Sequence, residues 1–236
     1  MTQALPALIL AAGRGERMRP LTDRTPKPLL PVRGKPLIEW HLEALSRAGV
    51  RQVVINTAWL EEQFPRQLGD GSRWGVSIAY SFEGRDHGGA LETAGGIAKA
   101  LPLLAGANGG AFWVVSGDVF VPGFDFDVRD AQGFAVDAGR LAHLWLVSNA
   151  PHHPQGDFGL DGAQGLATRE PPWLTWSSIG LFRAAMFEGI VPGTHMKLRP
   201  LLDAALDAGR LGAQRWGGAW IDVGTVERWR SVGGQE

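Results

Sequence analysis

The sequence predicts an α/β domain with a mostly parallel sheet and helices on both faces. Two observations support this fold class. Short apolar runs, which read as buried strands, alternate with segments whose apolar residues recur at helical spacing. Glycine and charged residues follow several of these runs, at the strand ends where open parallel sheets bind ligands. The 236 residues, 44% of them apolar, suit one domain spanning 1–236 with a sizeable core.

The first half of the chain carries the regular alternation. Apolar runs predict strands at 4–12, 50–57, 76–81 and 111–120. Helices are predicted between them at 36–49, 59–69 and 93–106. The apolar face of the first helix has five members: Leu37, Ile38, His41, Leu42 and Leu45. Gly49 ends that helix.

The second half is less regular. Strands are predicted at 139–149 and 173–182, with a loop-rich stretch at 151–172 between them. A helix is predicted at 197–209, and a strand running into a terminal helix at 217–230.

Composition narrows the function classes. The net charge of −1 argues against a dedicated nucleic-acid binder, which is usually basic. The chain has no cysteine, which excludes disulfides and thiolate chemistry. No apolar run is long enough for a membrane span, and the N-terminus lacks a signal-peptide pattern. We therefore expect a cytoplasmic protein with neither a nucleic-acid nor a membrane partner.

One loop concentrates positive charge. Between positions 13 and 35 there are seven basic and two acidic residues, a local charge of +5. Five prolines stiffen this stretch, because each fixes its own φ and restrains its predecessor: Pro20, Pro26, Pro28, Pro31 and Pro36. The pattern is not a dinucleotide fingerprint, since Gly13 and Gly15 have no third glycine in register. A stiff basic loop after a buried strand indicates a phosphate site.

The same residues resemble a known family. The stretch "LAAGRGERMRPLTDRTPKPLLPV" resembles the signature of the sugar-1-phosphate nucleotidylyltransferases, and the resemblance continues through "SGDV", "SSIGLF" and "WIDVGT". It implies a Rossmann-like core of the nucleotide-diphospho-sugar transferase type. It further implies a nucleotide-binding half at about 1–125 and a sugar-binding half at about 126–236. A monomer is expected, with a homodimer left open.

A narrower resemblance concerns the substrate. The segments "LVSNAPHHPQGDFGL", "ALETAGGI", "FEG" and "KLRPLL" are similar to those of the N-acetylmuramate α-1-phosphate uridylyltransferases of bacterial cell-wall recycling. This implies Mg²⁺-dependent transfer of UMP from UTP to N-acetylmuramate 1-phosphate, which gives a UDP-sugar and pyrophosphate.

Alternatives stay open. The stretch "GRDHGGA" is longer than expected beside the base, so another nucleoside triphosphate or sugar is possible, as in a mannose-1-phosphate guanylyltransferase. A non-catalytic nucleotide-sugar sensor predicts the loss of a catalytic arginine, lysine or aspartate, and all are present.

The resemblance assigns catalytic roles. Backbone amides of Ala12, Gly13 and Gly15 would cradle the phosphates. The catalytic residues would be Arg17 on the departing pyrophosphate, Lys27 between the α-phosphate and the sugar phosphate, and Asp118. Asp118 and Asp222 match the family's two Mg²⁺-binding aspartates, and each closes an apolar run. Magnesium needs few protein ligands, because it keeps water and phosphate oxygens.

The remaining candidates concern base and sugar. Either Glu83 or Glu92 would accept from uracil N3–H, and the Gly95 or Gly96 amide would donate to the base. The sugar side is expected at Asn149, Asp157, Ser178, Gly180 and Lys197. His152 and His153 are interpreted as loop or substrate-facing residues rather than zinc ligands, because neighbouring side chains point apart and no third ligand clusters with them.

Overall fold

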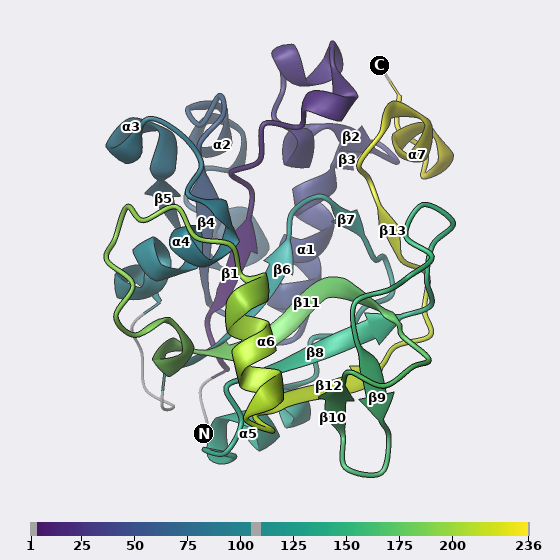
Figure 1. The fold of residues 1–236 in the computed structure, drawn as a ribbon. Helices are drawn as coiled ribbons and strands as arrows, with labels where there is room; N and C mark the ends of the chain where they lie inside the picture. The colour runs from purple at the N-terminus through teal and green to yellow at the C-terminus, as the bar shows by residue number, and fades with distance from the viewer. Residues whose placement is uncertain (1–3, 105–109, 236) are drawn as a thin grey trace.

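A nine-stranded sheet forms the centre of the molecule. The computed structural model describes residues 4–104 and 110–235. Strand order across the sheet is β5-β4-β1-β6-β11-β8-β12-β10-β9 (Figure 1). The first four strands are mutually parallel, and in the whole sheet only β11 and β10 run against the rest. The predicted fold class, a mostly parallel sheet with helices on both faces, is confirmed.

The elements have the following bounds. The sheet contains β1 (Ala7–Leu10), β4 (Gln52–Thr57), β5 (Ser77–Phe82), β6 (Ala111–Ser116), β8 (Ala142–Val147), β9 (Gly159–Asp161), β10 (Leu166–Thr168), β11 (Thr175–Arg183) and β12 (Leu211–Arg215). Two short pairs lie outside it: β2 (Pro31–Val32) with β3 (Lys35–Pro36), and β7 (Val119–Phe120) with β13 (Ile221–Asp222). The α-helices are α1 (Leu37–Arg47), α2 (Gln63–Leu68), α3 (Glu83–His87), α4 (Glu92–Ala100), α5 (Val128–Val136), α6 (Arg199–Asp207) and α7 (Val226–Ser231). Short 3₁₀ turns lie at Glu16–Met18, Leu21–Asp23, Lys27–Leu29, Ser72–Trp74, Leu101–Leu103 and Ala184–Phe187.

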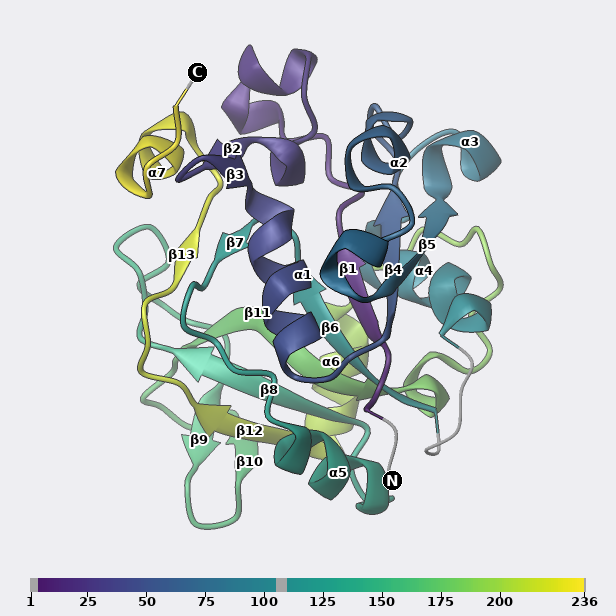
Figure 2. The ribbon, with the colours of Figure 1, turned by 180° about the vertical axis from the view of Figure 1, so that it is seen from behind.

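Helices cover both faces of the sheet. Helices α4 and α6 lie in front of it in Figure 1, and α1 and α5 in Figure 2, which shows the opposite side. The strands alternate between two cores, as a pleated strand must. In β1, Ala7 and Ile9 face the α1 and α5 side, while Leu8 faces the α4 and α6 side. His41 of α1, expected on the apolar face, is 1% exposed.

Helix α5 and strand β12 were not predicted, and the short strands β9 and β10 lie in the stretch at 151–172 that was expected to be rich in loops. Helix α5 buries only Ala131 and Phe134, and β12 is a short run of small and polar residues, so neither produces a strong periodic signal. The predicted helix at 93–106 ends earlier, with a 3₁₀ turn at Leu101–Leu103, and its last two positions lie outside the described residues.

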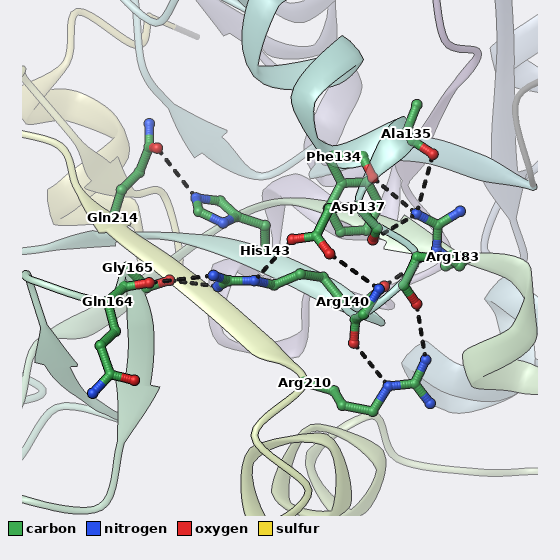
Figure 3. Close-up of polar contacts among 12 residues, drawn as sticks. Phe134, Ala135, Asp137, Arg140, His143, Gln164, Gly165, Arg183, Arg210 and Gln214 are labelled. Atoms are coloured by element: carbon green, nitrogen blue, oxygen red, sulfur yellow. Dashed lines mark hydrogen bonds and ion pairs between the residues drawn. The ribbon is translucent and has the colours of Figure 1, made fainter.

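Arginines fix the end of α5, as Figure 3 shows. The guanidinium of Arg183 donates to the carbonyl oxygens of Phe134, at 2.8 Å, and Asp137, at 3.2 Å. Arg210 donates to the carbonyl of Gly139 at 2.8 Å. Carbonyls at a helix end otherwise lack partners, and an arginine fork satisfies several at once. These contacts tie α5 to β11 and β12.

Candidate active site

A cavity opens at the carboxyl ends of the parallel strands. Its volume is about 350 Å³. β1, β4, β5 and β6 all contribute residues at or just beyond their last positions. This is the edge at which open α/β sheets bind ligands. The lining comprises Leu10, Ala11, Ala12, Gly13, Lys27, Pro28, Asn56, Glu83, Ala90, Glu92, Thr93, Ser116 and Asp118.

Lys27 and Asp118 form an ion pair at the floor of this cavity. Lys27 is 9% exposed and lies in the 3₁₀ turn Lys27–Leu29. Ser116, the last residue of β6, donates its hydroxyl to Oδ1 of Asp118 at 2.7 Å. Burial alone would raise the pKa of the Asp118 carboxyl, but the Lys27 charge and these hydrogen bonds outweigh it and lower the pKa.

A second cavity adjoins the first at Asp118. Its volume is about 460 Å³, and it shares Ser116 and Asp118 with the first. The rest of its lining comes from the basic loop, β7, the loop after β8, β11 and the segment that contains β13: Arg17, Val119, His152, His153, Thr175, Trp176, Ser178, Trp220 and Asp222. Asp118 therefore stands at the junction of two cavities.

Backbone pairing brings the two aspartates together. Asp222 lies opposite Val119 in the β13–β7 ladder, and the amide of Val223 donates to the Asp118 carbonyl at 2.9 Å. Both carboxylates are about three-quarters buried, with exposed fractions of 28% for Asp118 and 24% for Asp222. Each carboxylate already binds a side-chain cation, Lys27 in one case and Arg228 of α7 in the other.

The basic loop is braced by its own contacts. Gly15 has a φ of +69°, and its carbonyl accepts from the Thr22 hydroxyl at 2.8 Å. Arg14 contacts the Thr22 carbonyl at 2.9 Å and lies over the Trp59 ring at 3.6 Å from its centre. A Cβ on Gly15 would lie 2.9 Å from Thr22, so this glycine is required by the loop itself.

Gly13 and Arg17 remain open to a ligand. A Cβ on Gly13 would meet no atom within 4 Å, and the residue lines the first cavity. Ala12 lines it as well. Arg17 is exposed, lines the second cavity, and makes no ion pair within the part of the chain that the structure describes. The expected phosphate-side residues therefore divide between the two cavities.

Glu83 forms part of a buried hydrogen-bond chain. It is fully buried, and its two oxygens accept from Asn56 Nδ2, at 2.6 Å, and from the amide of Leu91, at 2.7 Å. Asn56 in turn accepts from the Ala11 amide at 2.9 Å. Burial raises the pKa of Glu83 despite these bonds. Glu83 thus connects β5 to the start of the phosphate loop.

Glu92 has a different environment. It is exposed, lines the first cavity, and adopts a φ of +62°, which is uncommon for a residue with a side chain. Of the two candidate base readers, both of which line the cavity, Glu92 is exposed, while both oxygens of Glu83 are engaged. The stretch 84–90 forms most of α3 and the turn after it, and its Ala90 also lines the cavity.

The glycine pair Gly95 and Gly96 allows close packing. The amide of Gly95 already donates to the Met196 carbonyl at 3.1 Å. A Cβ on Gly96 would lie 2.5 Å from Glu83 Oε1 and 2.7 Å from Asn56 Nδ2. Glycine at position 96 therefore lets α4 rest on the Glu83–Asn56 pair.

Among the sugar-side candidates, Asn149 and Asp157 are occupied by the fold. Asn149 donates to the carbonyls of Pro154 and Trp173, both at 3.0 Å, and accepts from the Thr175 hydroxyl at 2.9 Å. Asp157 accepts from the Trp176 amide at 2.8 Å and contacts His153 at 3.2 Å. Both residues hold the loop that presents the histidines.

The other three sugar-side candidates lie in three different environments. Ser178 lines the second cavity and has a φ of +63°. Gly180 lies within β11, where a Cβ would be 2.8 Å from Phe182 and 3.0 Å from the His143 carbonyl, so it is a packing residue of the sheet. Lys197 is exposed and lines neither cavity.

The adjacent histidines take different partners, as expected from the sequence. Nε2 of His153 lies 3.2 Å from Asp157, while His152 contacts Arg228 and lies 3.5 Å from Asp222. Within residues 4–104 and 110–235, no group of three or more histidine, aspartate or glutamate side chains could hold a metal ion unaided.

Sequence reasoning missed Asn56, Ser116 and Arg228. Asn56 is a polar residue near the end of an otherwise apolar strand, which was a usable signal. Ser116 is the first residue of the quoted motif "SGDV", two positions before Asp118, but no role was assigned to it. Arg228 gave no signal, because its partner His152 is 76 positions away in the chain.

Comparison with known proteins identifies the class. The Nucleotidyl transferase family model matches residues 6–164, and the chain belongs to this family. It is 51% identical over 224 residues to the N-acetylmuramate alpha-1-phosphate uridylyltransferase of Neisseria meningitidis serogroup B, covering 94% of each chain. It is 30% identical to the UTP–glucose-1-phosphate uridylyltransferase of a Synechocystis species, over 97% of this chain and 62% of that protein.

The fold comparison agrees. The solved structure of HddC from Yersinia pseudotuberculosis, complexed with GMP-PN, matches with a TM-score of 0.74 at 18% identity, covering 97% of each chain. The family model and the 51% identical relative confirm the family resemblance that the sequence motifs indicated. None of the described helices combines the length and apolar character needed to span a lipid bilayer.

Proposed function

We propose that this enzyme transfers UMP from UTP to N-acetylmuramate 1-phosphate. An oxygen of the sugar phosphate forms a bond to the α-phosphorus of UTP. The bond between that phosphorus and the oxygen leading to the β-phosphate breaks, and pyrophosphate leaves. A place in the reuse of cell-wall sugars, and a cytoplasmic location, belong to the same proposal. The 51% identity to the Neisseria uridylyltransferase over nearly the whole chain supports the choice of substrates.

The observation that carries the proposal is that Asp118 lines both cavities and is paired with Lys27, which lines the first. A nucleotide in the first cavity and a sugar phosphate in the second would bring two phosphates together beside the Lys27 ammonium. Because the two phosphates repel each other, a fixed and desolvated cation beside them would stabilise their approach. Because Lys27 is held by Asp118 and a proline-bounded turn, it is already oriented before substrates bind.

The phosphate loop supplies the remaining contacts. The open backbone at Ala12 and Gly13 would accept the triphosphate, since no side chain blocks the approach at position 13. Arg17, which has no ion pair among the described residues, would neutralise the charge that develops on pyrophosphate. Glu92, open to the first cavity, would accept from uracil N3–H.

Asp118 and Asp222 fit a magnesium ion. Asp222 lies in β13, Asp118 directly precedes its partner strand β7, and both residues line the second cavity. Two carboxylates suffice, because Mg²⁺ takes its other oxygens from water and phosphates. When bound, the ion supplies charge neutralisation on the phosphate oxygens.

A panel of substrates tests the proposal. UTP, GTP and dTTP would each be offered with N-acetylmuramate, N-acetylglucosamine, glucose and mannose 1-phosphates, and pyrophosphate release would be followed. The expected result is highest turnover with UTP and N-acetylmuramate 1-phosphate. A preference for GTP with mannose 1-phosphate would instead support the function named for the 30% identical zebrafish relative, a mannose-1-phosphate guanylyltransferase subunit. No pyrophosphate from any pair would support a sensor.

A further inference from the structure

Ser116 is a polar residue at the boundary between the two cavities. It is the last residue of β6, and it lines both cavities together with Asp118. Its side-chain hydroxyl donates to Oδ1 of Asp118 at 2.7 Å. The hydroxyl proton is therefore committed to the Asp118 carboxylate, at the place where the nucleotide and the sugar phosphate would approach each other.

The Asp118 carboxylate is held through both of its oxygens. Nζ of Lys27 donates to Oδ2, and the hydroxyl of Ser116 donates to Oδ1. Because a different residue engages each oxygen, the carboxylate cannot rotate without breaking one of these two bonds. An ionised carboxylate has about four acceptor positions, so the two side-chain donors still leave room for a further ligand. The pair of donors thus fixes the orientation of Asp118 without saturating it.

Backbone packing brings the two donors to this carboxylate. Leu10 lies opposite Ser116 in the β1–β6 pairing, and the amide of Gly117 donates to the Leu10 carbonyl at 2.8 Å. A Cβ on Gly117 would lie 3.1 Å from the Leu10 carbonyl oxygen and 3.3 Å from Cβ of Pro28. The Gly117 backbone therefore packs against the residue that follows Lys27. This contact holds the end of β6, with Ser116, against the turn that carries Lys27.

We propose that Ser116 is a positioning residue, which holds Asp118 so that it can pair with Lys27 and bind a magnesium ion at the same time. The inference rests on the proposed function, because it needs the magnesium-assisted reaction at these residues. Without the hydroxyl, Asp118 is held at one oxygen only and can turn both oxygens toward the Lys27 ammonium. A carboxylate in that orientation is a poorer metal ligand, and it offsets more of the charge that Lys27 presents to the phosphates.

The first test measures metal affinity directly. Binding of Mn²⁺ alone would be followed by electron paramagnetic resonance in the wild type, in Ser116→Ala, which removes the hydroxyl, and in Ser116→Thr, which keeps it. The alanine variant should bind Mn²⁺ about 10- to 100-fold more weakly, and the threonine variant should recover most of the affinity. Ser81→Ala is the matched control. Ser81 lies near the end of β5, its buried hydroxyl has no hydrogen-bond partner among the described residues, and it lines neither cavity, so its loss should leave the affinity unchanged.

A double-mutant cycle then shows whether Ser116 acts through Asp118. Ser116→Ala should lower the single-turnover rate about 10-fold or more in the wild type, but by less than about 2-fold in the Asp118→Asn background. An equal loss in both backgrounds would mean that the hydroxyl contacts a substrate itself, which overturns the positioning role.

Two results of the Mn²⁺ measurement also overturn the inference: an unchanged affinity in Ser116→Ala, or a Ser116→Thr variant as weak as the alanine one. The cycle can use whichever nucleotide and sugar phosphate the enzyme turns over, and the Mn²⁺ measurement needs no substrate. A wrong assignment of the substrates is therefore distinguishable from a wrong role for Ser116.

Discussion

Asp222 lies one ladder position from Asp118, because Val223 donates its amide to the Asp118 carbonyl at 2.9 Å. The two aspartates are more than 100 positions apart in the chain, this backbone pairing brings their main chains together, and both line the second cavity. Each aspartate lies at the end of a short apolar run, and the pairing of β13 with β7 brings those two ends of the runs together. It also makes their chemical roles separately testable.

Replacing either aspartate should abolish most of the turnover while the protein stays folded. Asp118→Asn and Asp222→Asn keep the side-chain shape but remove a charged oxygen ligand, and each should lower the single-turnover rate about 100-fold or more. Rates in magnesium would be compared with rates in EDTA, with circular dichroism as the folding control. Equal rates in magnesium and EDTA would refute the metal role.

Lys27→Met should affect chemistry more than nucleotide binding. The Lys27 charge matters most when two phosphates approach, so its loss should lower kcat about 100-fold or more while UTP affinity changes much less. Calorimetry with UTP alongside the rate measurement separates the two effects. If kcat and the affinity for UTP fell by the same factor, Lys27 would be a simple binding residue.

Two glycine substitutions should have opposite consequences. Gly13→Ala adds a methyl group where nothing lies within 4 Å, so stability should change by less than about 0.5 kcal/mol while UTP binding weakens. Gly96→Ala places a Cβ against Glu83 and Asn56, which should cost about 1–3 kcal/mol of stability. Urea unfolding and UTP titration would measure both quantities. Equal loss of stability in the two variants would contradict the packing assignments.

The buried histidine His41 should make stability depend on pH. Burial lowers its pKa to about 4, while the unfolded chain has the ordinary value of 6.5. Between these values the unfolded state binds more protons, so the free energy of unfolding falls as the pH drops from about 6.5 to 4. For one histidine this amounts to about 3 kcal/mol at most.

The variant His41→Leu isolates this contribution. It removes the titrating ring together with a buried Nε2 that has no hydrogen-bond partner. Urea unfolding from pH 7 to pH 4 should show a shallower loss of stability than in the wild type. Parallel pH profiles would show that His41 does not titrate as described. The comparison uses the slope of the unfolding free energy against pH, so a constant difference in stability between the wild type and the variant does not affect it.

Much of the site was predictable because its residues follow strong strands. Lys27, Asp118 and Asp222 stand in motifs attached to apolar runs. Parallel strands bring positions such as Asp118, just beyond β6, to one edge of the sheet, whereas Asp222 reaches the site through the antiparallel pair β13–β7. The loop candidates Asn149 and Asp157 were harder. Their polar side chains satisfy backbone groups of their own loop, and polar residues give the same sequence signal whether they bind a ligand or the chain.

Other features depended on distant contacts that no local pattern records. The strand β12 forms because β8 and β10 lie beside it, although its own residues are weakly apolar. Arg228 contacts Asp222 and His152, and His152 belongs to another part of the fold. Gly180 was expected at the sugar but is required by sheet packing.

The ratio of kcat/KM for N-acetylmuramate 1-phosphate to that for N-acetylglucosamine 1-phosphate, measured with UTP and magnesium, tests the central claim most directly. The two sugars differ only in the lactyl group, so the ratio isolates recognition of its carboxylate by the second cavity. We predict a preference for the muramate of about 10-fold or more, since an unpaired site costs about 1–3 kcal/mol. A ratio of one, or a preference for mannose 1-phosphate with GTP, would contradict the account.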